Sequence, residues 1–250
     1  MSQNHNINIH DDTYRNHPIR IYEVDGGWHS AMYLEDYLQN ELIFQYMIEA
    51  TQALHKLNHP KEGLLIGGGM YNFIRYTLSH NESIHMDVAE IDETTLETAK
   101  RYFDFDTFLK EYNPSDSPRL NIYFQDGREF LEHSPKQYDL IFNDAYDGVY
   151  PVQSLLSKEF IQIIQQHLSP NGIYVANLPG YIHLKKSKLL LDEIKTLEET
   201  FSYVNLVCAK NELSGVHIVN YVVFASNTFY QFENTVPYTT KKARIISDNE

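Results

Sequence analysis

The sequence predicts an α/β domain built on a mainly parallel sheet with helices on both faces. From residue 63 onward, short apolar runs alternate with segments whose apolar residues recur at helical spacing. The chain has 250 residues, of which 42% are hydrophobic, so it can bury one substantial core. The first apolar run, LLI, passes directly into three glycines, which permit a tight turn from a strand into a helix.

The first 60 residues differ in pattern from the rest of the chain. The start is rich in Asn, Asp and His without apolar periodicity, and we interpret it as a mobile tail. Alternating residues around Asp25-Gly26-Gly27 predict a β-hairpin over 19–34, and helical spacing predicts a helix over 36–57. We therefore divide the chain into a tail, a hairpin with a helix, and the main α/β domain, over residues 1–17, 18–60 and 61–250.

The main domain alternates strands and helices in order. Short apolar runs predict strands, the last two of which can pair antiparallel, over 63–69, 84–92, 119–126, 138–146, 172–180, 203–209 and 219–226. Amphipathic spacing predicts helices over 72–80, 93–103, 127–134, 155–168 and 187–201. Their ends are marked by possible caps such as Asp92 and Thr94 and by a Ser-Pro-Asn-Gly stop. Residues 104–118, polar at their end, are expected to form a longer connection.

Glycines and carboxylates follow four successive predicted strands. In open α/β sheets, ligands bind beyond the carboxyl ends of the strands, so these residues are candidates for a site. They are Gly67, Gly68 and Gly69 after the first strand, Glu90 and Asp92 at the second, Asp126 and Gly127 at the third, and Asp144 and Asp147 after the fourth.

Each of these groups has a structural and a functional interpretation. The glycines can form only a turn, or can let backbone N–H groups face a ligand. Glu90 lies 23 positions after Gly67, close to the roughly 20 typical of an acid that accepts ribose hydroxyls. Asp126 can accept from an adenine amine or cap the next helix. Asp144 and Asp147 can hold a cation and orient an attacking amine, or can form a turn and cap a helix.

Composition excludes several classes of function. The formal charge of −14 and the lack of a basic patch argue against nucleic acid as a partner. Cys208, the only cysteine, lies in an apolar run and is expected to be a buried thiol, and the histidine spacings predict no metal site. No apolar run approaches a bilayer span and the start has no secretory pattern, so we expect a cytoplasmic protein without a membrane partner.

The motifs LLIGGG, AEID, FQDG, YDLIFNDAYD and SLLSKEF, in this order and spacing, resemble the spermidine synthase family of aminopropyltransferases. The resemblance implies the seven-stranded, Rossmann-like fold of class I S-adenosylmethionine-dependent methyltransferases. It further implies that Gly67 to Gly69, Glu90 and Asp126 with Gly127 bind a sulfonium nucleoside, either decarboxylated S-adenosylmethionine or S-adenosylmethionine. Asp144 and Asp147 match the catalytic loop, where the first aspartate helps to deprotonate a small-molecule amine, and Gln45 in FQYM matches a ligand-contacting glutamine. The family also implies a homo-oligomer, a dimer.

The chain departs from this family at positions that handle the amines. The family's loop aspartate, which grips the donor's amino group, is Met70 here, and the tyrosine before the matched glutamine is Phe44. Three functions therefore stay open: an aminopropyltransferase-like enzyme, a methyltransferase that uses S-adenosylmethionine, and a catalytically silent adenosine-binding protein. The Asn143-Asp144-Ala145-Tyr146 segment has the spacing of an N-methyltransferase motif but lacks its prolines.

Overall fold

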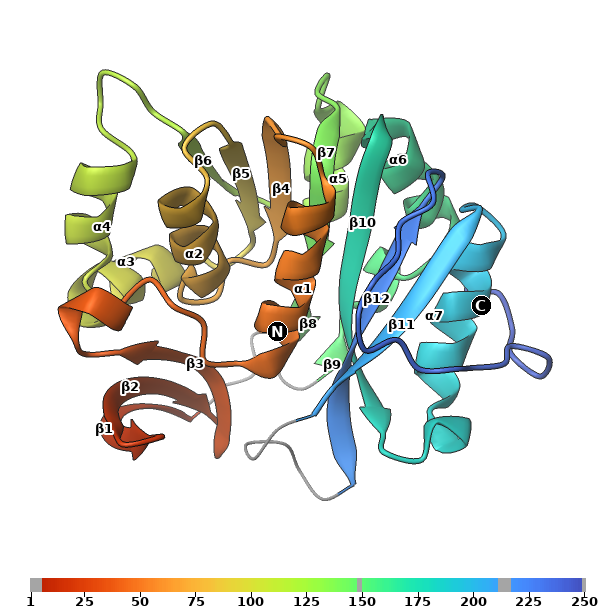
Figure 1. Ribbon diagram of the computed structural model, residues 1–250, viewed down its shortest axis with the longest axis horizontal. Coiled ribbons are helices and arrows are strands. Elements are labelled where there is room, and N and C mark those ends of the chain that lie inside the picture. Colours follow the sequence, from red (N-terminus) through yellow and green to blue (C-terminus); the bar gives the residue numbers. More distant parts are fainter. Residues whose placement is uncertain (1–5, 148–149, 211–216, 249–250) are drawn as a thin grey trace.

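A seven-stranded sheet forms the centre of the computed structural model, which describes residues 6–147, 150–210 and 217–248 (Figure 1). The strand order is β11-β12-β10-β7-β4-β5-β6. The parallel strands are β4 (Glu62–Ile66), β5 (His85–Glu90), β6 (Leu120–Phe124), β7 (Tyr138–Asn143) and β10 (Leu168–Tyr181). β12 (Ile218–Ser226) runs antiparallel to both β10 and β11 (Tyr203–Ala209). The predicted sheet and its antiparallel closing pair are confirmed.

Helices cover both faces of this sheet, as Figure 1 shows. One face packs against α1 (Gln45–Lys56), α2 (Asn72–His80), α3 (Thr94–Tyr102) and α4 (Phe105–Tyr112). The other face packs against α5 (Gly127–His133), α6 (Lys158–His167) and α7 (Lys188–Glu198). Successive strand residues point to opposite faces, so Leu65 joins the first core while Leu64 and Ile66 join the second. None of the described helices combines the length and apolar character that a bilayer crossing requires.

The N-terminal residues form a small antiparallel sheet of three strands in the order β1-β2-β3. The predicted hairpin is confirmed as β2 (His17–Val24) and β3 (Gly27–Tyr33), with positive φ at Asp25 and Gly26 in the turn. The prediction of a tail over 1–17 is wrong for the described residues from 7 onward, because β1 (Ile7–Tyr14) pairs with β2 along its whole length. Arg15 and Asn16 both adopt positive φ, which makes a two-residue turn without the glycine that usually marks one.

Two predicted elements differ from the structure. The helix expected over 36–57 is split into a 3₁₀ turn, η1 (Asp36–Leu38), and α1, because residues 39–44 leave the helical path. The connection expected over 104–118 contains α4, whose Phe105 and Phe108 are buried one turn apart against the first core. Their spacing, continued by Leu109 and Tyr112, is that of an amphipathic helix. The domain boundary at 60–61 stays a prediction, and α1 packs on the central sheet.

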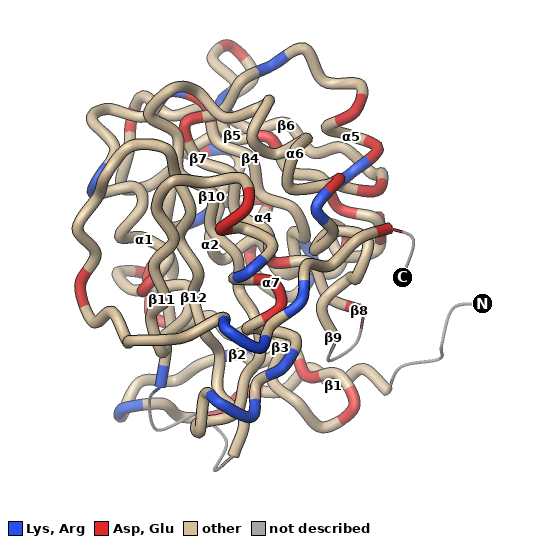
Figure 2. Tube along the Cα trace, turned by 90° about the vertical axis from the view of Figure 1, so that its right-hand side faces the viewer, with Lys and Arg blue, Asp and Glu red and all other residues tan. Residues whose placement is uncertain are grey.

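The last described residues run back across the helices of the second face toward α5 (Figures 1 and 2). Backbone bonds tie this segment to α6 and α7, since Ile246 O accepts from Lys158 N at 2.8 Å and Arg244 N donates to Asp192 at 2.8 Å. At its end, Asp248 accepts two bonds from the Arg128 guanidinium, at 2.8 and 2.7 Å. The segment therefore ends against α5 through the side chain of Arg128. A further 3₁₀ turn, η3 (Leu184–Lys186), precedes α7.

A glutamate lies in the second core without a partner. Glu193 on α7 is 0% exposed, and neither of its carboxyl oxygens has a hydrogen-bond partner. Burial raises the pKa of Glu193 well above its ordinary value of 4.5, so the group stays protonated in the folded protein at pH values where the unfolded chain ionises it. The folded state consequently loses stability as pH rises above about 4.5, toward the raised pKa.

We expect Glu193→Met to raise the free energy of unfolding by about 1–3 kcal/mol at pH 7, because it removes an unsatisfied buried polar group. The gain should be larger at pH 8 than at pH 5. Urea unfolding at the two pH values measures both. Glu97→Met, which changes a glutamate on α3 whose side chain is 78% exposed, should alter stability little, and equal gains from the two variants would contradict the assignment.

Candidate active site

The strand order reverses between β4 and β7, and most of the predicted site residues follow the carboxyl ends of these strands and of β5 and β6. Gly67, directly after β4, has a φ of +87° and donates its N–H to Ala89 O at 2.9 Å. Asp144, directly after β7, donates its N–H to Ile66 O at 2.9 Å. A Cβ on Gly67 would lie 2.7 Å from the Asp144 carbonyl oxygen, so the two loops touch at a place where only glycine fits.

Glu90 holds the glycine loop against the end of β5. Its carboxylate, in a residue only 7% exposed, accepts from Gly68 N at 2.7 Å and from Asp92 N at 2.8 Å. Each oxygen takes one of these bonds, and a carboxylate oxygen has a second acceptor direction available. Between the two acids, Ile91 is 74% exposed, which is unusual for a large apolar side chain at the end of a buried strand.

Asp126 and Gly127 begin α5 at the end of β6. Asp126 Oδ1 accepts from Arg128 N at 2.8 Å and from Glu129 N at 3.1 Å, so Asp126 caps this helix. Helix capping is one of the two roles that the sequence allowed for it, the other being adenine binding. The cap leaves Oδ2 without a described bond. A Cβ on Gly127 would collide with Ile66, so glycine lets α5 start close to β4.

The Asp144 side chain is held by neutral donors from two distant elements. Tyr46 on α1 donates its hydroxyl to Oδ2 at 3.1 Å, and Asn177 on β10 donates its amide to Oδ1 at 2.8 Å. Among the described residues, no Lys, Arg or His forms an ion pair with this carboxylate. Burial raises the pKa of Asp144 from 3.8 to about 7, against the opposing effect of the two hydrogen bonds. This acid can therefore exchange a proton near neutral pH.

Asp147 is exposed and separate from Asp144 in its contacts. It lies in β8 (Tyr146–Asp147), which pairs with β9 (Tyr150–Pro151) ahead of the turn η2 (Gln153–Leu155). No described hydrogen bond joins it to Asp144. The structure brings Asp144 against the glycine loop and leaves Asp147 at the rim.

Gln45, the first residue of α1, precedes Tyr46 and so lies at the same edge as Asp144. Its amide nitrogen donates to Glu49 Oε1 at 3.0 Å, which leaves the Gln45 carbonyl oxygen without a described bond. Sequence reasoning missed Tyr46 and Asn177 as contacts of Asp144. The one available signal was an amide at Asn177 inside an otherwise apolar strand.

Met70 and Tyr71 complete the loop by packing inward. Met70 is 1% exposed and belongs to the first core, and its N–H donates to Ser30 Oγ at 3.4 Å. Tyr71 has a φ of 59° and stacks on Phe105 at a centroid distance of 4.7 Å. Its ring packs against Gly68 so closely that a Cβ added there would lie 2.9 Å from it. No carboxylate occupies the position after the glycines, and the apolar side chain there is buried.

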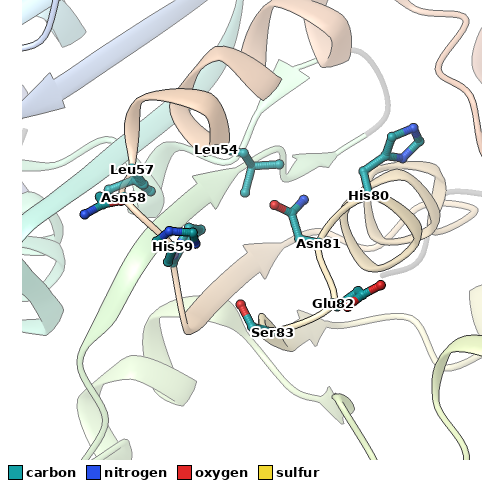
Figure 3. Close-up of a pocket in the computed structure, with 9 residues that line it drawn as sticks. Leu54, Leu57, Asn58, His59, His80, Asn81, Glu82 and Ser83 are labelled. Atoms are coloured by element: carbon teal, nitrogen blue, oxygen red, sulfur yellow. The ribbon is translucent and has the colours of Figure 1, made fainter.

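A cavity of about 470 Å³ lies elsewhere, at the opposite edge of the sheet. Figure 3 shows Leu54, Asn58, His59, His80 and Asn81 around it, from the segments that precede β4 and β5. These segments enter the amino ends of the strands, whereas Gly67, Glu90 and Asp144 follow the carboxyl ends. The cavity is thus separate from the candidate site.

The order and direction of the strands, with a glycine turn and acids at the switch point, define a class I methyltransferase-like α/β fold. Solved structures agree with this class. A probable spermidine synthase from Corynebacterium glutamicum superposes with a TM-score of 0.73 at 22% identity, over 92% of this chain and 79% of that one. Human methyltransferase-like protein 13, in complex with SAH, gives a TM-score of 0.60 at 21% identity, over 76% of this chain and 85% of that one.

Residues 41–234 match the family model described as the spermine/spermidine synthase domain, and the chain belongs to this family. Spermine synthase from Arabidopsis thaliana is 30% identical over 168 residues, which are 67% of this chain and 45% of that protein. A polyamine aminopropyltransferase from Thermococcus kodakarensis is 27% identical over 192 residues, 74% of this chain and 65% of that protein. The chain spans about half the length of several of the curated relatives that it matches.

We expect Gly67→Ala to cost more stability than Gly26→Ala, although both glycines have similar positive φ values, of +87° and +83°. A Cβ at Gly26 meets nothing within 4 Å, so that variant should cost only the roughly 1–2 kcal/mol of a left-handed alanine. At Gly67 the added carbon would also displace the Asp144 backbone, which should cost about 1–3 kcal/mol more. Urea unfolding measures the difference, and equal losses would show that the two loops do not depend on this contact.

We expect Asp144→Asn to stabilise the protein at pH 8 and to change little at pH 4. The folded pKa of about 7 exceeds the ordinary 3.8, so the wild type loses stability as pH rises between these values, and the amide removes this loss. The difference between the two pKa values sets the largest gain at pH 8 at about 4 kcal/mol. Thermal unfolding across this pH range tests it, and a variant that is less stable at pH 8 would contradict a buried, uncompensated carboxyl.

Proposed function

We propose that this protein transfers an aminopropyl group from decarboxylated S-adenosylmethionine to a small-molecule amine. The observation that carries the proposal is the Asp144 carboxyl group, buried beside the glycine loop, held only by neutral donors and titrating near neutral pH. Family membership supports the reaction class. A spermidine synthase solved in complex with the transition-state analogue AdoDATO has the same fold, with a TM-score of 0.66 at 18% identity, over 92% of this chain and 77% of that one.

The residues at the first three strand ends fit a nucleoside. Glu90 keeps an acceptor direction on each oxygen for ribose hydroxyls, and Ile91 offers an exposed apolar face on which a purine can pack. Asp126 has one carboxyl oxygen outside its helix cap, suited to an exocyclic amine. Gly67 and Gly68 permit the tight turn that packs against the Asp144 backbone and donates to Glu90, so both acids lie beside the same loop. Gln45 has a free carbonyl oxygen at the same edge.

When bound, the sulfonium donor supplies an electrophilic carbon and a neutral thioether leaving group. An amine attacks such a carbon only through its lone pair, and most of an aliphatic amine is protonated at neutral pH. Asp144 accepts the proton that the acceptor must lose, and Tyr46 and Asn177 keep its carboxyl plane fixed. Asp147, exposed at the rim, is placed to attract the remote cationic end of a diamine.

Incubation with decarboxylated S-adenosylmethionine and putrescine, spermidine or other diamines should release methylthioadenosine, measured by chromatography. The rate should rise with pH through about 7, because the base must be ionised. Asp144→Asn should lower kcat by about a hundredfold or more while methylthioadenosine still binds.

S-adenosylmethionine serves as the matched donor control in the same assay. Formation of S-adenosylhomocysteine from it, without methylthioadenosine from the decarboxylated donor, would make the protein a methyltransferase. Nucleoside binding without product from either donor would leave the silent adenosine-binding alternative.

A further inference from the structure

We infer that Asn220 is a positioning residue that sets the orientation of the Asn177 amide and, through it, the proton affinity of Asp144. Asn220 lies on β12 and does not touch Asp144 through any described bond. Its side-chain amide donates to Asn177 Oδ1 at 2.8 Å, and Asn177 Nδ2 donates to Asp144 Oδ1 at 2.8 Å. The effect of this chain of bonds on catalysis rests on the proposed function, whereas its effect on the proton affinity of Asp144 does not.

The strand pairing brings the two amides together. In the antiparallel register of β10 and β12, Asn220 pairs with Pro179, two residues beyond Asn177. Residues two apart on a strand share a face, so Asn177 and Asn220 are diagonal neighbours on the same side of the sheet. The Asn177 backbone is held as well, since its carbonyl oxygen accepts from the Tyr146 hydroxyl at 3.0 Å. The Asn177 amide can still turn about χ2, which exchanges its carbonyl oxygen and its NH₂ group.

An asparagine amide has two ends with opposite roles, a carbonyl that accepts and an NH₂ that donates. An ionised Asp144 can only accept, so it needs the NH₂ end of Asn177. The carbonyl end then points to β12 and requires a donor there, which the NH₂ group of Asn220 supplies. Without that donor, Asn177 can turn its carbonyl toward Asp144. This second orientation is favourable only when Asp144 carries a proton.

The other groups that face Asp144 do not set this orientation. Tyr46 from α1 donates to the second carboxyl oxygen, and the glycine loop meets Asp144 through the backbone. Tyr146 from β8 lies close enough for the Asp144 charge, together with burial, to raise the pKa of its phenol. Burial and the Asp144 charge raise the pKa of Tyr46 in the same way, so both phenols stay protonated through neutral pH. Asn177 is therefore the partner of Asp144 whose orientation is fixed by a further side chain, that of Asn220.

The test measures the pKa of Asp144 directly, by ¹³C NMR of the side-chain carboxyl in ligand-free protein labelled on aspartate, with Asp144→Asn as the assignment control. Asn220→Leu should raise this pKa by roughly half to one unit, because it removes the donor that fixes the amide. Asn220→Val is a second version of the test, with a β-branched side chain that suits a strand.

A double-mutant cycle shows whether the effect passes through Asn177. In an Asn177→Leu background, Asn220→Leu should leave the pKa of Asp144 unchanged. An unchanged pKa in both Asn220 variants of the otherwise wild-type protein would overturn the inference, and so would an equal shift in the two backgrounds. Urea unfolding of each variant separates a loss of stability, which a purely structural asparagine also gives, from the shift in proton affinity.

Turnover is not part of this measurement, so the two proposals can fail separately. The expected pKa shifts without any methylthioadenosine from the wild type would support the Asn220 role and reject the proposed reaction. Turnover by the wild type with no shift in the variants would do the opposite. If both hold, the acid limb of the kcat profile should move to higher pH in Asn220→Leu by the same amount as the NMR pKa.

Discussion

The contact between Gly67 and the Asp144 backbone is the constraint on which the arrangement of the candidate site depends. Parallel strands bring their carboxyl ends to one edge, but the loops after β4 and β7 lead to helices on opposite faces of the sheet and normally diverge at such a switch point. Here a residue without a side chain, in a left-handed conformation, lets the two loops touch. Glu90 fixes the glycine turn from one side and the β7 loop fixes it from the other. The distance between Glu90 and Asp144 is consequently set by the sheet.

Two aspartates in this protein, the buried Asp87 and the partly buried Asp144, show how the surroundings determine what a carboxyl group does. Asp87 on β5 is 1% exposed and is bonded by the Lys136 ammonium at 2.8 Å, the Tyr138 hydroxyl at 2.8 Å and an asparagine amide. A cation and two neutral donors offset its desolvation, which suits a structural role. Asp144 has neutral donors only. Its desolvation is offset in part, so it keeps the protonated form accessible and can take up and release a proton.

The sequence located the strand ends, and with them most of the candidate residues, because strand boundaries depend on local apolar patterns and turn residues. It did not give the partners of Asp144. Tyr46 lies 98 positions before Asp144 and Asn177 lies 33 positions after it, and no local pattern states which side chains from such distant elements meet. Two elements that the sequence did not predict, β1 and α4, were missed for local reasons instead. The turn at Arg15 and Asn16 lacks glycine, and the short helix α4 was hidden in a polar connection.

Met70 limits how charge can be distributed in the proposed reaction. Both the aminopropyl donor and the amine acceptor carry ammonium groups, and an ammonium group in a dry site needs a compensating carboxylate. Met70 is packed in the first core and offers none. Asp144 cannot pair permanently with the donor's ammonium and also serve as the proton acceptor for the incoming amine, since a carboxylate neutralised by one ion pair is a weaker base. On the proposed function, the donor's ammonium group must therefore stay partly hydrated, while the reacting amine meets Asp144 and its remote cationic end lies toward Asp147.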